Sequence, residues 1–147
     1  LWANIPNEKQ AMLTIEKYLI NPDEMWTEFG IRTLSKTVCG YNNINMIKPH
    51  SNWQGPIWVV SNYMYIWGMM NYGYYQQSID ASKNITKLLL SSIEKYGGMY
   101  ENYDAETGKP LAAPGFISWN LLSSHLLHSV LCKENIADIS PITGFLD

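Results

Sequence analysis

The residues of this chain with the clearest chemical potential are one carboxylate and a group of aromatic rings. Glu101 lies between two tyrosines in residues 97–104, which read GGMYENYD. Earlier in the chain, residues 52–58 read NWQGPIW and place two tryptophans close together. Aromatic rings offer flat apolar faces for stacking, and a carboxylate can take up a proton when a glycosidic bond is cleaved. The two segments together favour a sugar-cleaving pocket.

An inverting sugar hydrolase needs two carboxyl groups about 6.5–9.5 Å apart, one to protonate the leaving oxygen and one to deprotonate a water. Glu101 is our candidate for the base, with Tyr100 and Tyr103 available to orient it. The alternative is that Glu101 only caps a helix or pairs with a nearby cation. Asp104 and Glu106 belong to a turn-like segment, so we interpret them as surface residues rather than catalysts.

The remaining polar residues show no second reactive pattern. His125 and His128 have a spacing that suits one helix face, but no acidic residue lies beside them, and His50 is distant. We therefore expect no metal and no cofactor. Cys39 and Cys132 lack C-x-x-C spacing, so we expect two buried free thiols in a reducing compartment.

The composition is that of a globular chain with one domain. It has 147 residues, of which 46% are hydrophobic and 16% charged, and its net charge of -3 gives no basic footprint for nucleic acid. The longest apolar run, residues 56–70, is too short and too polar for a membrane span. The chain begins at Leu1 without a signal peptide, so we interpret it as the interior of a longer protein, expected in the cytoplasm.

Hydrophobic periodicity predicts an all-α fold. Helices are expected over residues 8–20, 56–72, 77–96 and 114–132. The second and fourth are apolar on most sides and should be buried, whereas the third has one apolar stripe and one charged face. Long connections at residues 27–55 and 97–113 precede the two apolar helices, and long ordered connections are usually functional.

The two apolar helices begin with the same pattern, which indicates a weak internal repeat. The repeated positions are Pro56, Trp58 and Asn62 in the first copy and Pro114, Phe116 and Asn120 in the second. We interpret the pattern as helical hairpins in which buried inner helices alternate with half-exposed outer ones, as in a helical toroid.

This alternation has a geometric consequence for Glu101. Because one antiparallel helix separates the two inner helices, these run parallel, and the connections that precede them open at the same end of the array. Glu101 should therefore converge on one pocket with the aromatic residues of segment 52–58.

Four segments resemble glycoside hydrolase family 63, which includes processing α-glucosidase and mannosylglycerate hydrolase and is related to trehalase. Residues 52–63 resemble its N-W-R-G-P-[IV]-W…N-Y segment, and residues 100–108 resemble its [WY]-E-x-Y-D-x-x-T-G segment. Residues 113–119 resemble its A-P-G-F-x-W continuation, and residues 29–35 its G-[IVL]-x-[ST]-L-S segment. The matches are collinear and span most of the chain.

The resemblance implies an (α/α)6 barrel of twelve helices and an inverting mechanism. Glu101 matches the family's general base. The wall of the subsite for the sugar that is cleaved off would comprise Trp53, Gln54, Trp58, Tyr100 and Trp119.

The sequence departs from the family in two respects. Gln54 stands where the family commonly has arginine, so a charged contact to the substrate is missing. The family's general acid is an aspartate upstream of these motifs, and no residue of this chain matches it. We therefore predict that residues 1–147 are the C-terminal portion of a single (α/α)6 glycosidase catalytic domain, and that they are inactive alone.

The expected partners are a carbohydrate substrate and either the remainder of the catalytic domain or a self-association partner, but no nucleic acid and no membrane. The alternative from another class is a non-catalytic helical module for sugar binding or assembly. Its apolar inner helices would then be buried against a partner.

Overall fold

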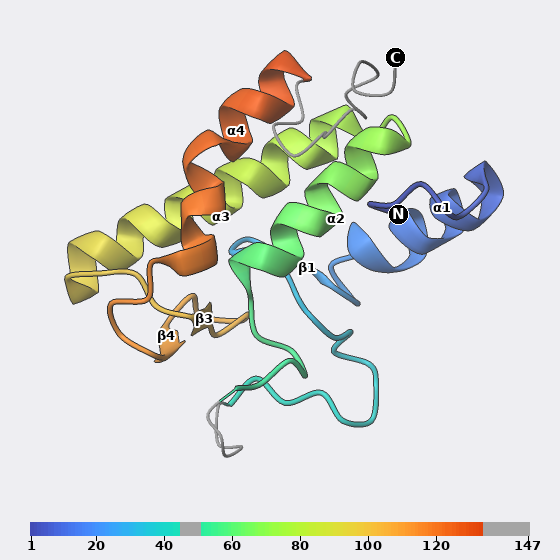
Figure 1. Cartoon of the computed structure of the whole chain (residues 1–147). Coiled ribbons are helices and arrows are strands. Elements are labelled where there is room, and N and C mark those ends of the chain that lie inside the picture. Colours follow the sequence, from blue (N-terminus) through green and yellow to red (C-terminus); the bar gives the residue numbers. More distant parts are fainter. Residues whose placement is uncertain (45–50, 134–147) are drawn as a thin grey trace, which may run out of the picture.

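The computed structural model describes residues 1–44 and 51–133 and is mostly helical (Figure 1). The helices are α1 (Glu8–Thr14), continued by the π-helical turn η1 (Ile15–Leu19), α2 (Val59–Asn71), α3 (Tyr75–Tyr96), the 3-10 helix η2 (Ser118–Leu122) and α4 (Ser123–Cys132). Two antiparallel hairpins pair β1 (Trp26–Thr27) with β2 (Gly30–Ile31), and β3 (Asn102–Tyr103) with β4 (Pro110–Ala112). None of the helices within these residues has the length and apolarity to cross a membrane.

The predicted arrangement of the long helices is confirmed. In Figure 1, α2 and α4 run in the same direction, and α3 runs antiparallel to them and packs against both. The helix α3 ends at Gly97, whose φ of 78° is the left-handed conformation that glycine adopts most easily. The parallel helices α2 and α4 therefore begin at the same end of the array.

The first helix forms as its sequence predicts. The side chain of Asn7 accepts a hydrogen bond from the backbone of Gln10, whose side chain in turn accepts one from the backbone of Asn7. This capping box satisfies two amide groups that helix starts otherwise leave free. Ile15 and Leu19 then pack into the core with residues of α2 and α4.

The helix α2 begins later than predicted and is less buried. We expected a helix from Pro56, but Ile57 forms an antiparallel bridge and Trp58 is extended, with φ of -118° and ψ of 130°. The N–H and C=O groups of Ile57 are thus bonded to Tyr103, so they are not available for the hydrogen bonds of a helix. The expectation that this helix is buried on all sides was also wrong, because Met64 is 43% exposed.

The last predicted helix is likewise shorter at its start. Residues 114 and 115 form a turn, residues 116 and 117 are irregular, and the chain then passes through η2 into α4. The amides of Gly115 and Phe116 both donate to the carbonyl of Met99, at 2.9 and 3.1 Å, so they are bonded to the preceding loop instead of entering a helix.

The two long connections meet through the backbone of Ile57. Its N–H donates to the carbonyl of Tyr103 at 2.8 Å, and the N–H of Tyr103 donates back at 3.0 Å. Ile57 also forms a bridge with Arg32 in the other connection. The segment before α2 and the loop before η2 are therefore hydrogen-bonded neighbours, as their predicted position at one end of the array requires.

An ion pair strengthens this junction. Arg32 is only 3% exposed and its Nη2 lies 2.6 Å from Oε1 of Glu106, which also accepts a hydrogen bond from the hydroxyl of Tyr41 at 2.9 Å. Partial burial of Glu106 acts to raise its pKa, but the hydrogen bonds from Arg32 and Tyr41 prevail and lower it. Glu106 thus has a structural role as the partner of Arg32 and Tyr41.

We predict that Glu106→Gln destabilises the protein by about 1–3 kcal/mol at pH 7, because it leaves the buried guanidinium of Arg32 without its charged partner. The side chain of Glu106 is 53% exposed, so the effect should lie near the lower end of that range. Since the pKa of Glu106 is lowered on folding, its contribution is present above about pH 4.5 and disappears as the pH falls through the folded-state value.

Denaturant unfolding of both variants at neutral and acidic pH tests this. The matched control is Asp23→Asn, which removes a carboxylate from an exposed pair with Lys36 at 3.5 Å and should change stability little. Equal midpoints for Glu106→Gln and the unchanged protein at pH 7 would contradict the prediction.

Candidate active site

Glu101 lies in the loop between Gly97 and β3, with its backbone held and its carboxylate without a partner among the described residues. Its N–H donates to the carbonyl of Ala112 at 3.0 Å. The side chain is partly exposed, and no ion pair of the described residues includes it. Among these residues the carboxylate thus has neither the cation partner nor the capping role of the structural alternative.

A row of aromatic rings begins in the segment that precedes α2. The rings of Trp53 and Trp58 stack with centroids 3.8 Å apart and an angle of 16° between their planes. Trp58 contacts Trp119 of η2 with centroids 5.8 Å apart, and Trp119 contacts Phe116 at 4.8 Å. The row therefore joins the starts of the two parallel inner segments.

The rings in this row differ in exposure. Trp58 has no exposed surface, and its Nε1 donates to the carbonyl of Asn52 at 2.8 Å. Trp53 is 47% exposed and covers Trp58. Of the two, only Trp53 can offer a ring face to a ligand in this arrangement, and Trp58 supports it from behind.

Gln54 follows Trp53 in a bend whose backbone is hydrogen-bonded on both sides. Its N–H donates to Oδ1 of Asn52 at 2.8 Å, and its carbonyl accepts from the N–H of Asn42 at 2.7 Å. The side chain is exposed, so its amide is available for an uncharged hydrogen bond.

Tyr100 and Trp119 both pack against the core cluster that contains Ile57 and Tyr103. Tyr100 directly precedes Glu101, and its carbonyl accepts a hydrogen bond from the side chain of Asn120 at 2.8 Å. The ring contacts therefore bring Trp53, Trp58 and Trp119 together at the junction of the two connections. Tyr100 and the backbone of Glu101 lie in the loop that forms this junction, and Gln54 follows Trp53 in segment 52–58. Their catalytic and binding roles stay predictions. Asn120 drew attention in the sequence only as a member of the internal repeat.

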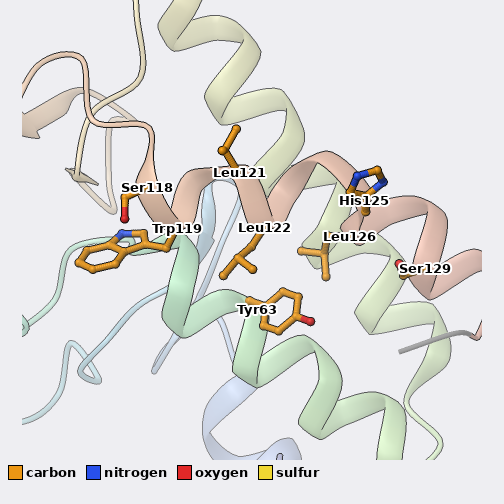
Figure 2. Close-up of a pocket in the computed structure, with 8 residues that line it drawn as sticks. All are labelled: Tyr63, Ser118, Trp119, Leu121, Leu122, His125, Leu126 and Ser129. Atoms are coloured by element: carbon orange, nitrogen blue, oxygen red, sulfur yellow. The ribbon is translucent and has the colours of Figure 1, made fainter. Parts of the chain in front are cut away.

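A groove that sequence reasoning missed lies between α2 and the η2–α4 segment. Figure 2 shows Tyr63 of α2 facing the side chains of η2 and α4 across it. Its volume is about 460 Å³, and its lining is mostly apolar, with Trp119 at one end and Leu122 and Leu126 along it. Leu121 is 56% exposed. An apolar lining suits packing by another helix better than binding of a sugar.

The other candidate residues contribute no further site in the described part of the chain. Within residues 1–44 and 51–133, no three His, Cys, Asp or Glu side chains could hold one metal ion, and His50 lies outside those ranges. Cys39 and Cys132 are free, but the expectation that they are buried was wrong. Cys39 lies in an exposed turn, and Cys132 is an exposed residue at the last position of α4.

The profile of the glycosyl hydrolase family 63 C-terminal domain matches residues 1–129. The chain belongs to this family. It is 22% identical over 135 residues to a probable mannosyl-oligosaccharide glucosidase of Schizosaccharomyces pombe, covering 84% of this chain and 16% of that protein. It is 26% identical over 112 residues to a mannosyl-oligosaccharide glucosidase of Arabidopsis thaliana, covering 70% of this chain and 13% of that protein.

Solved structures show the same fold. The family 63 mannosylglycerate hydrolase from Thermus thermophilus, in complex with Tris, superposes with a TM-score of 0.62 and 22% identity, over 87% of this chain and 27% of that one. An uncharacterized conserved protein from the same organism gives a TM-score of 0.64 and 21% identity, over 86% of this chain and 28% of that one. The family 63 chain thus matches part of the (α/α)6 toroid.

The unequal burial of the stacked tryptophans leads to a prediction on stability. Trp58→Ala should cost about 3–5 kcal/mol, because it opens a large cavity beneath Trp53. Trp53→Ala should cost much less, since its ring is half exposed. Denaturant unfolding of both variants checks the difference, and an equal loss of stability would show that Trp53 is a core residue rather than a surface ring.

Proposed function

We propose that this family 63 chain is the C-terminal part of the catalytic domain of an inverting α-glycoside hydrolase that acts on α-glucosides or related oligosaccharides. In this proposal Glu101 is the general base. The observation that carries it is the carboxylate of Glu101, which has no ion-pair partner among the described residues and is attached to a fixed backbone. Its loop is hydrogen-bonded to the aromatic segment 52–58.

The surroundings of Glu101 suit a general base. Such a group must be free to accept a proton and must hold one position relative to the attacking water. Glu101 is partly exposed and has no cation partner among the described residues, whereas nearby Glu106 is neutralised by Arg32. Asp104, the third carboxylate of this loop, accepts hydrogen bonds from the N–H groups of Glu106 and Thr107, both at 2.8 Å. Of the three, Glu101 is thus the one available for chemistry.

The aromatic row supplies the sugar-binding wall in this proposal. The exposed ring of Trp53 stacks on a sugar face, and buried Trp58 keeps that ring in place. Trp119 and Tyr100 complete the wall beside Glu101. The neutral amide of Gln54 hydrogen-bonds sugar hydroxyls, where an arginine would attract an anionic group.

The second carboxyl group and the rest of the pocket come from other parts of the protein in this proposal. The chain spans 13–16% of the length of the two glucosidases described above. Further helices of the toroid would carry the general acid. They would also fill the apolar groove of Figure 2, where Leu121 and Leu122 are exposed.

We predict that Glu101→Gln in the full-length protein lowers kcat by about 10²–10⁴-fold, because the amide cannot accept the proton of the attacking water. Substrate affinity should be largely kept, since the aromatic wall is intact. Steady-state kinetics and substrate titration of the variant measure the two effects.

The matched control is Glu94→Gln, which removes an exposed carboxylate from α3 and should leave both quantities unchanged. A Glu101→Gln variant with normal turnover would overturn the assignment of the base. Absence of glycosidase activity in the full-length protein itself would favour the non-catalytic sugar-binding or assembly module.

We also predict that the 147-residue chain alone does not hydrolyse α-glucosides. It would lack the acid, whose help is worth about 10²–10⁴-fold, and the opposite wall of the pocket. Release of glucose from an aryl or oligomeric α-glucoside measures this. Turnover by the chain alone at a rate like that of the full-length enzyme would contradict the proposal.

A further inference from the structure

The internal repeat places one buried asparagine at the same position in both inner segments, and each binds the preceding connection. In the first copy, Nδ2 of Asn62 donates to the carbonyls of Trp58 and Ile31, both at 2.9 Å. Its Oδ1 accepts from the N–H of Ile31 at 2.7 Å. Asn62 therefore holds both backbone groups of one loop residue.

The second copy makes the same contacts except one. Nδ2 of Asn120 donates to the carbonyls of Phe116 and Tyr100, at 2.9 and 2.8 Å. Its Oδ1 is buried and has no partner among the described residues. The N–H of Tyr100 donates instead to the hydroxyl of Tyr103, at 2.8 Å. The backbone of Tyr100 is thus held by two side chains where that of Ile31 is held by one.

Tyr103 is itself fixed to α3. It has no exposed surface, and its hydroxyl donates to Oγ of Ser92 at 3.3 Å. Ser92 in turn donates to the carbonyl of Gly98 at 2.7 Å. Burial raises the pKa of the Tyr103 hydroxyl, which keeps it protonated and able to donate at neutral pH.

We propose that Asn120 and Tyr103 are positioning residues for Glu101, an inference that rests on the proposed role of Glu101 as the base. Glu101 directly follows Tyr100, so its place is set by the two hydrogen bonds to the Tyr100 backbone and by its own bond to Ala112. The bonds come from η2, from β3 and from β4. A base must be held closely, since a misplacement of about 1 Å can cost on the order of 100-fold in rate.

The free Oδ1 of Asn120 makes the two positioning residues partly redundant. In the first copy the same atom of Asn62 accepts the loop N–H. When Tyr103 loses its hydroxyl, the N–H of Tyr100 is released and Oδ1 of Asn120 can accept it in the same way. Asn120 can therefore compensate for the loss of the Tyr103 hydroxyl, and the effects of the two substitutions should not be independent.

The test measures kcat and KM of the full-length protein for Asn120→Ala, Tyr103→Phe and the double variant, on folded protein only. Asn120→Ala should lower kcat roughly 10–100-fold, with KM changed less than about threefold. Tyr103→Phe should have a smaller effect. The double variant should lose at least about fivefold more than the product of the single losses.

The matched control is Asn62→Ala, which removes the equivalent buried asparagine away from Glu101. It should destabilise the fold at least as much as Asn120→Ala, because Asn62 makes one more buried hydrogen bond, but keep kcat within about threefold. The acid limb of the kcat/KM pH profile, which reports the base, should move in Asn120→Ala and not in Asn62→Ala. If Asn62→Ala does not fold, Asn62→Ser replaces it in the same comparison.

Two results would overturn the inference. One is an equal loss of kcat in Asn120→Ala and its Asn62 control, with unchanged pH profiles, which would mean a purely structural role. The other is a double variant that equals the product of the single ones, which would remove the shared support. Glu101→Gln in the same series separates the two proposals. Normal turnover of Glu101→Gln would defeat the assignment of the base. Lost turnover of Glu101→Gln together with an unchanged kcat of Asn120→Ala would defeat only the positioning roles.

Discussion

The arrangement depends on one pair of backbone hydrogen bonds, between Ile57 and Tyr103. Both residues are fully buried, so their amide and carbonyl groups must find partners within the protein, and they find each other. The pair joins the extended stretch before α2 to the loop before η2. Because Ile57 also bridges to Arg32, both long connections are joined at one end of the helices. This junction places the aromatic row and the backbone of Glu101.

Around the junction, one ion pair and two asparagine side chains fix the loops to the helices. The Arg32–Glu106 pair links the first connection to the second, and the two asparagines bind each connection to the inner segment that follows it. Functional residues commonly lie on loops that a rigid scaffold positions. In this family 63 chain, hydrogen bonds from the scaffold extend into the loops. Glu101 is held through its own backbone and that of Tyr100, and within the described residues its carboxylate takes no part in this.

Sequence patterns predicted the long helices and missed the short strands. The helices followed from apolar spacing, and the parallel direction of the inner helices followed from their order. The hairpins at Thr27 and Asn102 have strands of two or three residues, too short for any alternation to show. The extended backbone of Ile57 was missed because distant partners, rather than its own neighbours in sequence, decide its conformation. Glu101 was found from its aromatic surroundings, whereas the contact of Asn120 with Tyr100 spans twenty residues and leaves no local signal.

The most direct test of the account is a crystal structure of the full-length Glu101→Gln protein with an uncleaved α-glucoside. We predict that the sugar lies on the ring of Trp53, and that the side chain at position 101 contacts a water on the face of the anomeric carbon opposite the leaving oxygen. The carboxyl group on the other side should be an aspartate about 6.5–9.5 Å away. A sugar bound away from this junction, or a side chain at position 101 without contact to that water, would contradict the central claim.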